Sequence, residues 1–190
     1  MKDKIKKTIT DHKRLVDVFE KTGIDAAVQI AQAIIDCFKN GGTVYLCGNG
    51  GSAADCQHVA AELVGRFRMD RKAMPAVALS TDTSLLTSVG NDYGFEEIFR
   101  RQVEGLVSKG DILWAFSTSG KSPNIISAAL LAKEKGATVI SFTGRGNSEL
   151  EKISDLCFCI DTPAASSAQE IHQLAYHIIC ELVEEQAAGK

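Results

Sequence analysis

The sequence of 190 residues predicts a doubly wound α/β fold, in which helices cover both faces of a five-stranded parallel sheet. Short apolar runs alternate with longer segments of helical periodicity. The runs are continuous, as expected for strands that are covered on both sides. Gly110-Asp111 and Gly136-Ala137 stand where helices give way to strands. The predicted strands are 43–47, 76–79, 112–116, 138–142 and 156–160.

Two predicted helices, 1–21 and 25–40, precede the α/β pattern. The second is apolar over more than half of its circumference, which indicates burial on two sides, one of them against another subunit. We expect one domain over 1–190, with a helical segment at 1–40 and an α/β core with a C-terminal helix at 41–190. The remaining predicted helices are 53–65, 83–90, 95–107, 123–135, 147–153 and 168–186.

Composition excludes several classes of protein. The net charge of −3 gives no electrostatic reason for general nucleic-acid binding, which needs a basic face. No stretch approaches the roughly 20 apolar residues of a membrane span, and the basic start of the chain lacks the apolar core of a signal peptide. The cysteines form no Cys-x-x-Cys pair, so we expect buried thiols in a reducing cytoplasm. They are Cys37, Cys47, Cys56, Cys157, Cys159 and Cys180.

A glycine-rich turn after the first strand is the leading functional candidate. Gly48, Gly50 and Gly51 allow the backbone to approach a bound group closely. The helix start that follows offers free N–H groups and a partial positive charge, which suit a phosphate. Deeper in that helix, His58 and Glu62 are four residues apart and share a face. The alternative for this pair is an ordinary contact on a helix surface.

A second polar loop follows the third strand. Its hydroxyls, on Ser117, Thr118, Ser119 and Ser122, surround a glycine. Ser122 has the place of a helix N-cap and Pro123 that of the first helical residue. In a doubly wound sheet the loops after strands one and three face the ligand together. The segment therefore predicts a phosphate site, and the alternative is a capped loop with solvated serines.

Two nucleotide-binding motifs are incomplete in these loops. The stretch from Gly48 to Ala53 matches a loose dinucleotide fingerprint, but no acidic residue closes the second strand. The serine loop resembles the end of a Walker A motif, yet position 115 is alanine where that motif requires glycine. Neither a dinucleotide enzyme nor a nucleotide triphosphatase is favoured.

The last helix carries a second set of candidate ligands. Its His177 could join His58 and Glu62 around a divalent ion such as zinc. Helical spacing does not select a fourth ligand, because Glu170 and Glu181 lie closer to the face of His177 than Gln169 does. In a polar break after the second strand, Asn91 and Asp92 could bind sugar hydroxyls or could simply form a turn.

The motifs together resemble the bacterial phosphoheptose isomerases of the sugar isomerase (SIS) domain class. The resemblance covers nearly the whole chain from about residue 20, with six blocks in the same order and spacing. Those blocks are Cys-Gly-Asn-Gly-Gly-Ser (47–52), Asp-x-x-His-x-x-x-Glu (55–62), Gly-Arg-Phe-Arg (65–68), Gly-Asn-Asp-Tyr-Gly-Phe (90–95), Ser-Thr-Ser-Gly-Lys-Ser-Pro-Asn (117–124) and Gln-Glu-Ile-His…His (169–177).

The resemblance implies a flavodoxin-like, Rossmann-like SIS fold and a specific reaction. That reaction is the interconversion of D-sedoheptulose 7-phosphate and D-glycero-D-manno-heptose 7-phosphate through an enediol, the first step toward nucleotide-activated heptose for products such as lipopolysaccharide. It implies one zinc ion per subunit on His58, Glu62, Gln169 and His177, with Glu62 and His177 catalytic. It also implies a homotetramer with active sites between subunits. The implied substrate-binding residues are Asn49, Gly50, Gly51, Ser52, Glu62, Arg66, Asn91, Asp92, Ser117, Thr118, Ser119, Ser122 and Gln169.

The chain departs from the family pattern at one position, and two other functions stay open as alternatives. Family members usually carry arginine two residues before the glutamine, whereas this chain has Ser167. One alternative is a related non-catalytic protein that associates with the replication initiator; in that group the position of His177 is not histidine. The other alternative is an isomerase for a different sugar phosphate.

Overall fold

The computed structural model describes residues 1–188 and contains the predicted five-stranded sheet. All neighbouring strands are parallel, in the order β2-β1-β3-β4-β5. The strand order reverses at β1, which lies between β2 and β3, so the doubly wound prediction is confirmed. The strands are β1 (Val44–Gly48), β2 (Ala76–Ala78), β3 (Ile112–Ser117), β4 (Thr138–Thr143) and β5 (Leu156–Cys159).

The helices occupy the predicted segments, with ends shifted by a few residues. All six residues of the central strand β3 are buried, which explains why its sequence is an unbroken apolar run. One predicted helix, 95–107, is divided into the short 3-10 helix η1 (Phe95–Glu97) and α5 (Arg100–Leu106). The other helices are α1 (Lys2–Thr22), α2 (Ile24–Lys39), α3 (Gly51–Val64), α4 (Thr83–Asp92), α6 (Pro123–Glu134), α7 (Glu149–Ile153) and α8 (Ala165–Ala187).

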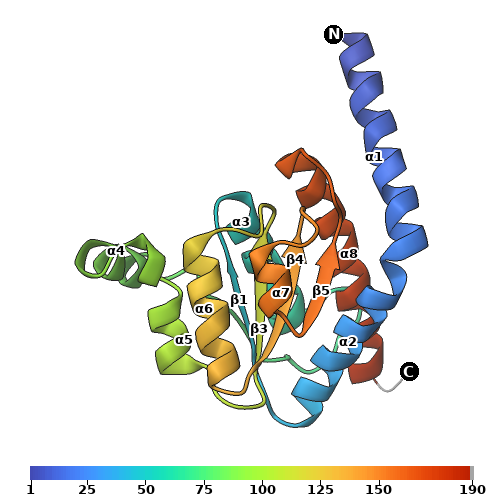
Figure 1. The fold of residues 1–190 in the computed structure, drawn as a ribbon. Coiled ribbons are helices and arrows are strands. Elements are labelled where there is room, and N and C mark those ends of the chain that lie inside the picture. The colour runs from blue at the N-terminus through green and yellow to red at the C-terminus, as the bar shows by residue number, and fades with distance from the viewer. Residues whose placement is uncertain (189–190) are drawn as a thin grey trace.

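The two faces of the sheet carry different cores (Figure 1). The face toward α2, α3 and α8 packs the large aromatic side chains of Trp114, Phe116 and Phe142. The face toward α5, α6 and α7 is filled mostly by aliphatic residues and alanines. Both α3 and α8 begin at the carboxyl ends of strands and lie on the same, aromatic face.

The N-terminal helix extends away from the body (Figure 1). Its outer half exposes Ile5 and Ile9, while Leu15 is buried. On α2, Ile30 and Ile34 are fully buried, but Val28 on another face is 54% exposed. The covering of α2 by a second subunit therefore stays a prediction, as does the single-domain organisation.

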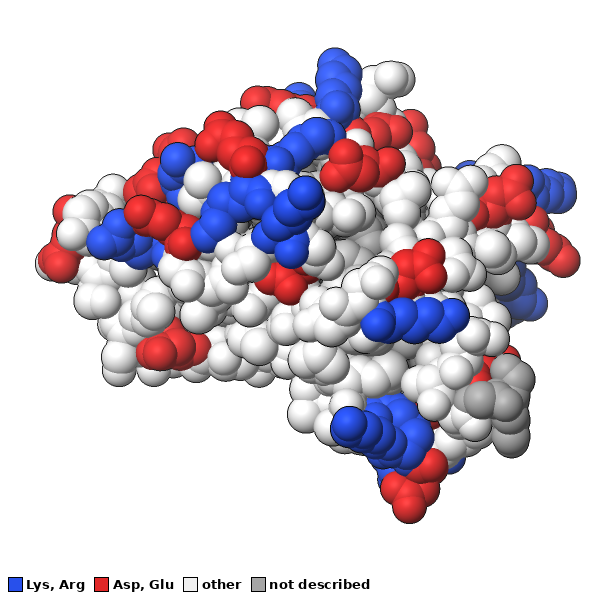
Figure 2. Space-filling view, turned by 90° about the horizontal axis from the view of Figure 1, so that it is seen from below, with Lys and Arg blue, Asp and Glu red and all other residues white. Residues whose placement is uncertain are grey.

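Several predictions from composition can be compared with the structure. All six cysteines are free thiols, and four of them are buried. Within residues 1–188, no helix combines the length and apolar character needed to cross a bilayer. On the face drawn in Figure 2, basic and acidic side chains are interspersed.

Candidate active site

The glycine-rich turn links the end of β1 to the first turn of α3. Gly50 has a φ of +56°, a backbone conformation that L side chains rarely adopt. Gly48 is equally restricted, because a Cβ there would lie 2.7 Å from the carbonyl oxygen of Ser52. Ser52 itself is buried. The tight turn thus depends on glycine at both positions and leaves the start of α3 open above Gly50, where a Cβ would meet nothing within 4 Å.

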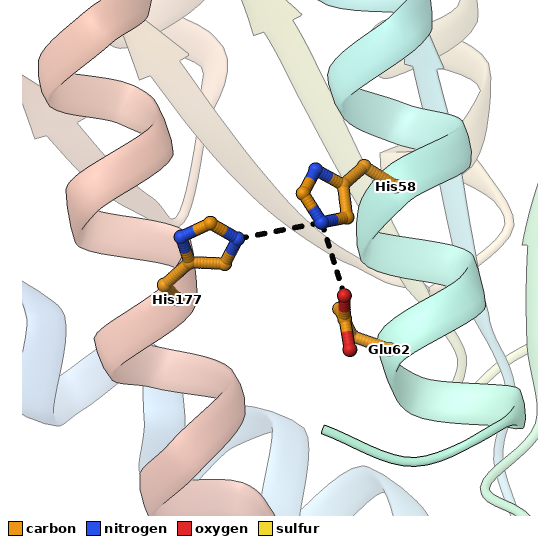
Figure 3. Close-up of side chains that lie close together, drawn as sticks. All are labelled: His58, Glu62 and His177. Atoms are coloured by element: carbon orange, nitrogen blue, oxygen red, sulfur yellow. Dashed lines mark hydrogen bonds and ion pairs between the residues drawn. The ribbon is translucent and has the colours of Figure 1, made fainter. Parts of the chain in front are cut away.

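Two helices bring His58, Glu62 and His177 together (Figure 3). His58 Nε2 lies 3.0 Å from Glu62 Oε1 and 3.4 Å from His177 Nε2. One ligand atom from each side chain falls within 4.8 Å of the other two. Two imidazoles and a carboxylate form a donor set that zinc takes in catalytic sites. The predicted convergence of α3 and α8 on one cluster is present, but within a single chain, whereas we expected the two helices to meet across a subunit boundary.

Tyr176 and Asp55 form a hydrogen-bonded group at the Nδ1 side of His58. The Tyr176 hydroxyl lies 3.1 Å from His58 Nδ1 and donates to Asp55 Oδ1 at 3.4 Å. When His58 carries its proton on Nδ1, that N–H donates to the tyrosine oxygen and Nε2 presents a lone pair to the cluster. Burial raises the pKa of Asp55, an effect that hydrogen bonds from Tyr176 and Gln169 reduce.

His177 is half-buried and faces the cluster from α8. Its imidazole stacks on the Phe67 ring, with centroids 5.5 Å apart and planes inclined by 22°. Burial, followed by the proximity of His58, lowers the pKa of His177. The neutral imidazole is therefore favoured, and this is the form that can bind a metal or accept a proton.

Gln169 occupies a different place from the other three predicted metal ligands. Its amide packs on Gly51, where a Cβ would lie 2.4 Å from both Nε2 and Oε1. The eight residues from Gln169 to His177 correspond to about 12 Å along α8. Gln169 thus borders the glycine-rich turn, two turns of helix away from His177. Its place in the metal site stays a prediction.

The serine loop after β3 is organised by its own hydroxyls. Ser117 Oγ lies 3.4 Å from Ser119 Oγ and 3.2 Å from Ser122 Oγ. Ser122 has the predicted N-cap position of α6, but its side chain makes no capping hydrogen bond. Gly120, with a φ of +62°, lets the loop turn against Ser148. Thr118 is half-buried and Ser119 is exposed, so hydroxyls are available at the surface of the loop.

The loops after β1 and β3 face one another, as the strand order requires. The side-chain amides of Asn49 and Asn124 exchange two hydrogen bonds of 2.9 Å. Beside them is a pocket of about 300 Å³ that Ser122, Phe95 and Glu96 also line. The switch point of the sheet therefore carries an open pocket to which both loops contribute polar side chains.

Three predicted substrate contacts lie outside both this pocket and the cluster of His58, Glu62 and His177. Asn91 and Asp92 are exposed at the end of α4, where Asn91 Nδ2 donates to Asp92 Oδ1 at 2.8 Å. In Figure 1, α4 projects on the side of the molecule opposite α8. Arg66 is exposed in the turn after α3. A single chain does not bring Asn91 and Asp92 to His58 and His177.

Comparison with known proteins identifies the family. Residues 9–144 match the SIS domain family. The chain is 45% identical to a phosphoheptose isomerase of Aquifex aeolicus over 190 residues, which is the full length of both proteins. It is 48% identical to a phosphoheptose isomerase of Akkermansia muciniphila over 161 residues, 85% of each chain. The chain belongs to the phosphoheptose isomerase family.

A solved structure of this family has the same fold. The phosphoheptose isomerase of Neisseria gonorrhoeae superposes with a TM-score of 0.92 at 37% identity, covering 97% of this chain and 98% of that one. The SIS-domain architecture predicted from the sequence is therefore confirmed.

Sequence reasoning missed several residues that support the cluster. Asp55 lies one turn before His58 on the same helix face, a spacing that could have revealed it. Tyr176 gave no such signal, because an aromatic residue in an apolar segment is normally a core residue. Phe67 lies in the Gly-Arg-Phe-Arg block (65–68), but no role was assigned to it. Their contacts with the two histidines follow only from how α3 and α8 pack.

Proposed function

We propose that the protein interconverts D-sedoheptulose 7-phosphate and D-glycero-D-manno-heptose 7-phosphate. The observation that carries this proposal is the convergence of His58, Glu62 and His177 within 4.8 Å. Family membership supplies the reaction, and the cluster supplies a base, a second proton carrier and a ligand set. The nearby serine loop provides hydroxyls that suit a phosphate monoester.

We propose that zinc, one ion per subunit, binds to His58, Glu62 and His177, with Gln169 as the fourth ligand. The lowered pKa of His177 and the hydrogen-bond partner on His58 Nδ1 both favour neutral imidazoles as ligands. When bound, the ion acts as a Lewis acid that polarises the sugar carbonyl and stabilises negative charge on its oxygen.

The chain's own residues transfer the protons in this proposal. Glu62 removes a proton from C1 of the ketose, and the resulting enediol receives a proton at C2. His177, on the opposite helix, moves the proton between the two neighbouring oxygens. Positioned acids and bases of this kind typically contribute about 10²–10⁴-fold to a rate. The half-buried setting of Glu62 and His177 limits exchange of these protons with water.

Binding of the substrate uses the two loops at the switch point. Ser117, Thr118, Ser119 and Ser122 hold the phosphate, while Asn49, Gly50, Gly51 and Ser52 line the sugar. Their placement beside the Asn49–Asn124 pair supports this assignment, because both loops then face one pocket. We assign Arg66, Asn91, Asp92 and Gln169 as further contacts.

We also propose a homotetramer with active sites between subunits. Asn91 and Asp92 lie on the projecting α4, next to Tyr93 and Phe95, which are 64% and 65% exposed. A second subunit could place such a segment over the cluster of its neighbour. The six free thiols support a reducing compartment, the cytoplasm.

The reaction can be tested with ketose phosphates of five, six and seven carbons. We expect turnover of the seven-carbon substrate to exceed that of the others, with activity lost on chelation and regained on addition of zinc. Metal analysis of the purified protein identifies the bound ion. A protein that never converts sedoheptulose 7-phosphate, although it is folded and contains metal, would reject the proposal.

A further inference from the structure

The turn that follows α3 is fastened to α8 by a buried carboxylate. Glu184 is 1% exposed and accepts hydrogen bonds from three consecutive backbone N–H groups. They belong to Phe67 at 2.8 Å, Arg68 at 2.6 Å and Met69 at 2.9 Å. Burial alone would raise the pKa of Glu184, but these bonds and the charge of Arg71 together lower it. The turn is therefore held by an ionised group, with little freedom to move.

Arg71 connects the same carboxylate to the end of α3. Its Nε lies 3.3 Å from Glu184 Oε1, and its side chain is 3% exposed. The guanidinium donates to the carbonyl oxygen of Glu62 at 2.6 Å and to that of Leu63 at 2.7 Å. The Arg71–Glu184 pair thus joins the backbone of Glu62 to α8. Glu184 is seven residues beyond His177, so the two lie on nearly the same face of that helix.

The fastened turn places one aromatic ring against His177. The Phe67 ring stacks on the imidazole, nearly parallel to it. Arg68 covers the Phe67 ring, with its guanidinium carbon 5.2 Å from the ring centroid, and forms an ion pair with Glu181 on α8. A stacked ring restricts tilting of the imidazole, so it fixes the plane of the ring in which Nε2 lies 3.4 Å from His58 Nε2.

We propose that Phe67 is a positioning residue for His177 and that the buried Arg71–Glu184 pair keeps Phe67 in place. Phe67 has no group that could take part in proton transfer or bind zinc. Its effect is to fix the plane of the imidazole relative to His58 and Glu62. The inference rests on the proposed function for the reaction and for zinc as the ion. The arrangement of Phe67, His177, Arg71 and Glu184 is given by their contacts in this chain.

Substitution of Phe67 tests the inference through metal affinity as well as turnover. We expect Phe67→Leu to weaken zinc binding about tenfold, measured by competition with a chromophoric chelator, because partners that orient a ligand typically contribute 10- to 100-fold. We expect kcat to fall by a similar factor with KM nearly unchanged. Phe67→Tyr keeps the ring and should retain both values.

Phe38→Leu is the matched control. Phe38 is also half-buried and packs against the same apolar core, but its pocket is formed with Ile35, Met74 and Val183. This variant should bind zinc as the wild type does. A Phe67→Leu protein with wild-type zinc affinity and kcat would overturn the inference. So would a Phe67→Tyr protein as impaired as Phe67→Leu, or a wild type that takes up no zinc.

The buried pair is tested with Glu184→Gln and Arg71→Lys. Circular dichroism first establishes which variant folds. If Glu184→Gln does not fold, the test relies on Arg71→Lys, which keeps a positive charge beside Glu184. Either folded variant should weaken zinc binding as Phe67→Leu does, and unchanged affinity would overturn the role of the pair. Weaker zinc binding by Phe67→Leu, in a protein whose wild type does not isomerise sedoheptulose 7-phosphate, would support positioning while rejecting the reaction.

Discussion

Two histidines on α8, five residues apart, occupy opposite environments. His172 is fully buried among Phe116, Phe142 and Phe158, and its Nε2 lies 3.0 Å from the carbonyl oxygen of Thr143. His177 is half-buried and faces His58 on α3, with their Nε2 atoms 3.4 Å apart. One side chain type in one helix thus serves packing on one face and, in the proposed function, metal or proton chemistry on another.

The difference shows that burial decides what an imidazole can do. Burial lowers the pKa of His172 to about 4, so it stays neutral and its ring N–H donates to Thr143. The pKa of His177 is lowered too, but this residue remains partly exposed. Only a histidine with an open coordination position can bind a metal or exchange a proton with substrate.

The largest expected effect is at the cluster of His58, Glu62 and His177. Glu62→Gln and His177→Ala should each reduce kcat by about 10²–10⁴-fold, because each removes a proposed proton carrier. Both variants should keep the wild-type oligomeric state, measured by size-exclusion chromatography with light scattering. Near-wild-type turnover in either variant would remove that residue from the proposed acid–base pair.

The free energy of unfolding should depend on pH because of the buried His172. The unfolded chain protonates histidine near pH 6.5, whereas folded His172 has a pKa of about 4. The unfolded state therefore binds more protons over that window, so this contribution to stability is complete above pH 6.5 and decreases as the pH falls toward 4. Between pH 7.5 and 4.5 we expect a loss of about 2–3 kcal/mol in the free energy of unfolding.

His172→Gln isolates this effect, since its amide can still donate to the Thr143 carbonyl but does not titrate. Denaturant unfolding at one fixed protein concentration should show a shallower dependence on pH for the variant than for the wild type. Equal dependence in both proteins would mean that His172 is not the group responsible.

A smaller effect is expected at the first turn of α3, where Gly51 contacts Gln169. Gly51→Ala introduces a Cβ 2.4 Å from the Gln169 amide atoms, so this flexible side chain must move. If Gln169 serves the active site, kcat should fall roughly 10- to 100-fold while the melting temperature changes little. Gly105→Ala in α5, whose Cβ would meet nothing within 4 Å, is the control. Unchanged kcat in Gly51→Ala would remove Gln169 from the ligand set.

The smallest effect is expected on the outer side of α8. His12 on α1 and Glu170 form an exposed pair at 2.9 Å, and such pairs contribute about 0–1 kcal/mol. Glu170→Ala should therefore leave activity and melting temperature nearly unchanged. A large loss of turnover would show that α1 takes part in the active site.

Much of the fold could be predicted because its signals are local. The continuous apolar run of β3 and the glycines before β3 and β4 identify buried strands without knowledge of their neighbours. The serine loop and the glycine-rich turn are likewise continuous segments, so residues such as Gly50 and Ser119 could be found directly.

The residues that support the site could not be predicted, because their contacts depend on packing between segments that are distant in the sequence. Tyr176 contacts His58 across 118 positions of sequence, and Glu184 contacts Phe67 across 117. His58 and Phe67 lie in recognisable sequence blocks, but no pattern in the sequence links them to Tyr176 and Glu184. The role of Gln169 came from resemblance, because helical spacing left Glu170 and Glu181 open as alternatives.

The arrangement of α3, α6 and α8 has a consequence for how a ligand approaches. All three helices begin at the carboxyl ends of strands, so their positive dipole ends share one edge of the sheet. That edge attracts the anionic end of an incoming molecule before any side chain contacts it. A sugar with a phosphate at one end is therefore favoured to approach with that end first, whereas its neutral counterpart has no such preference.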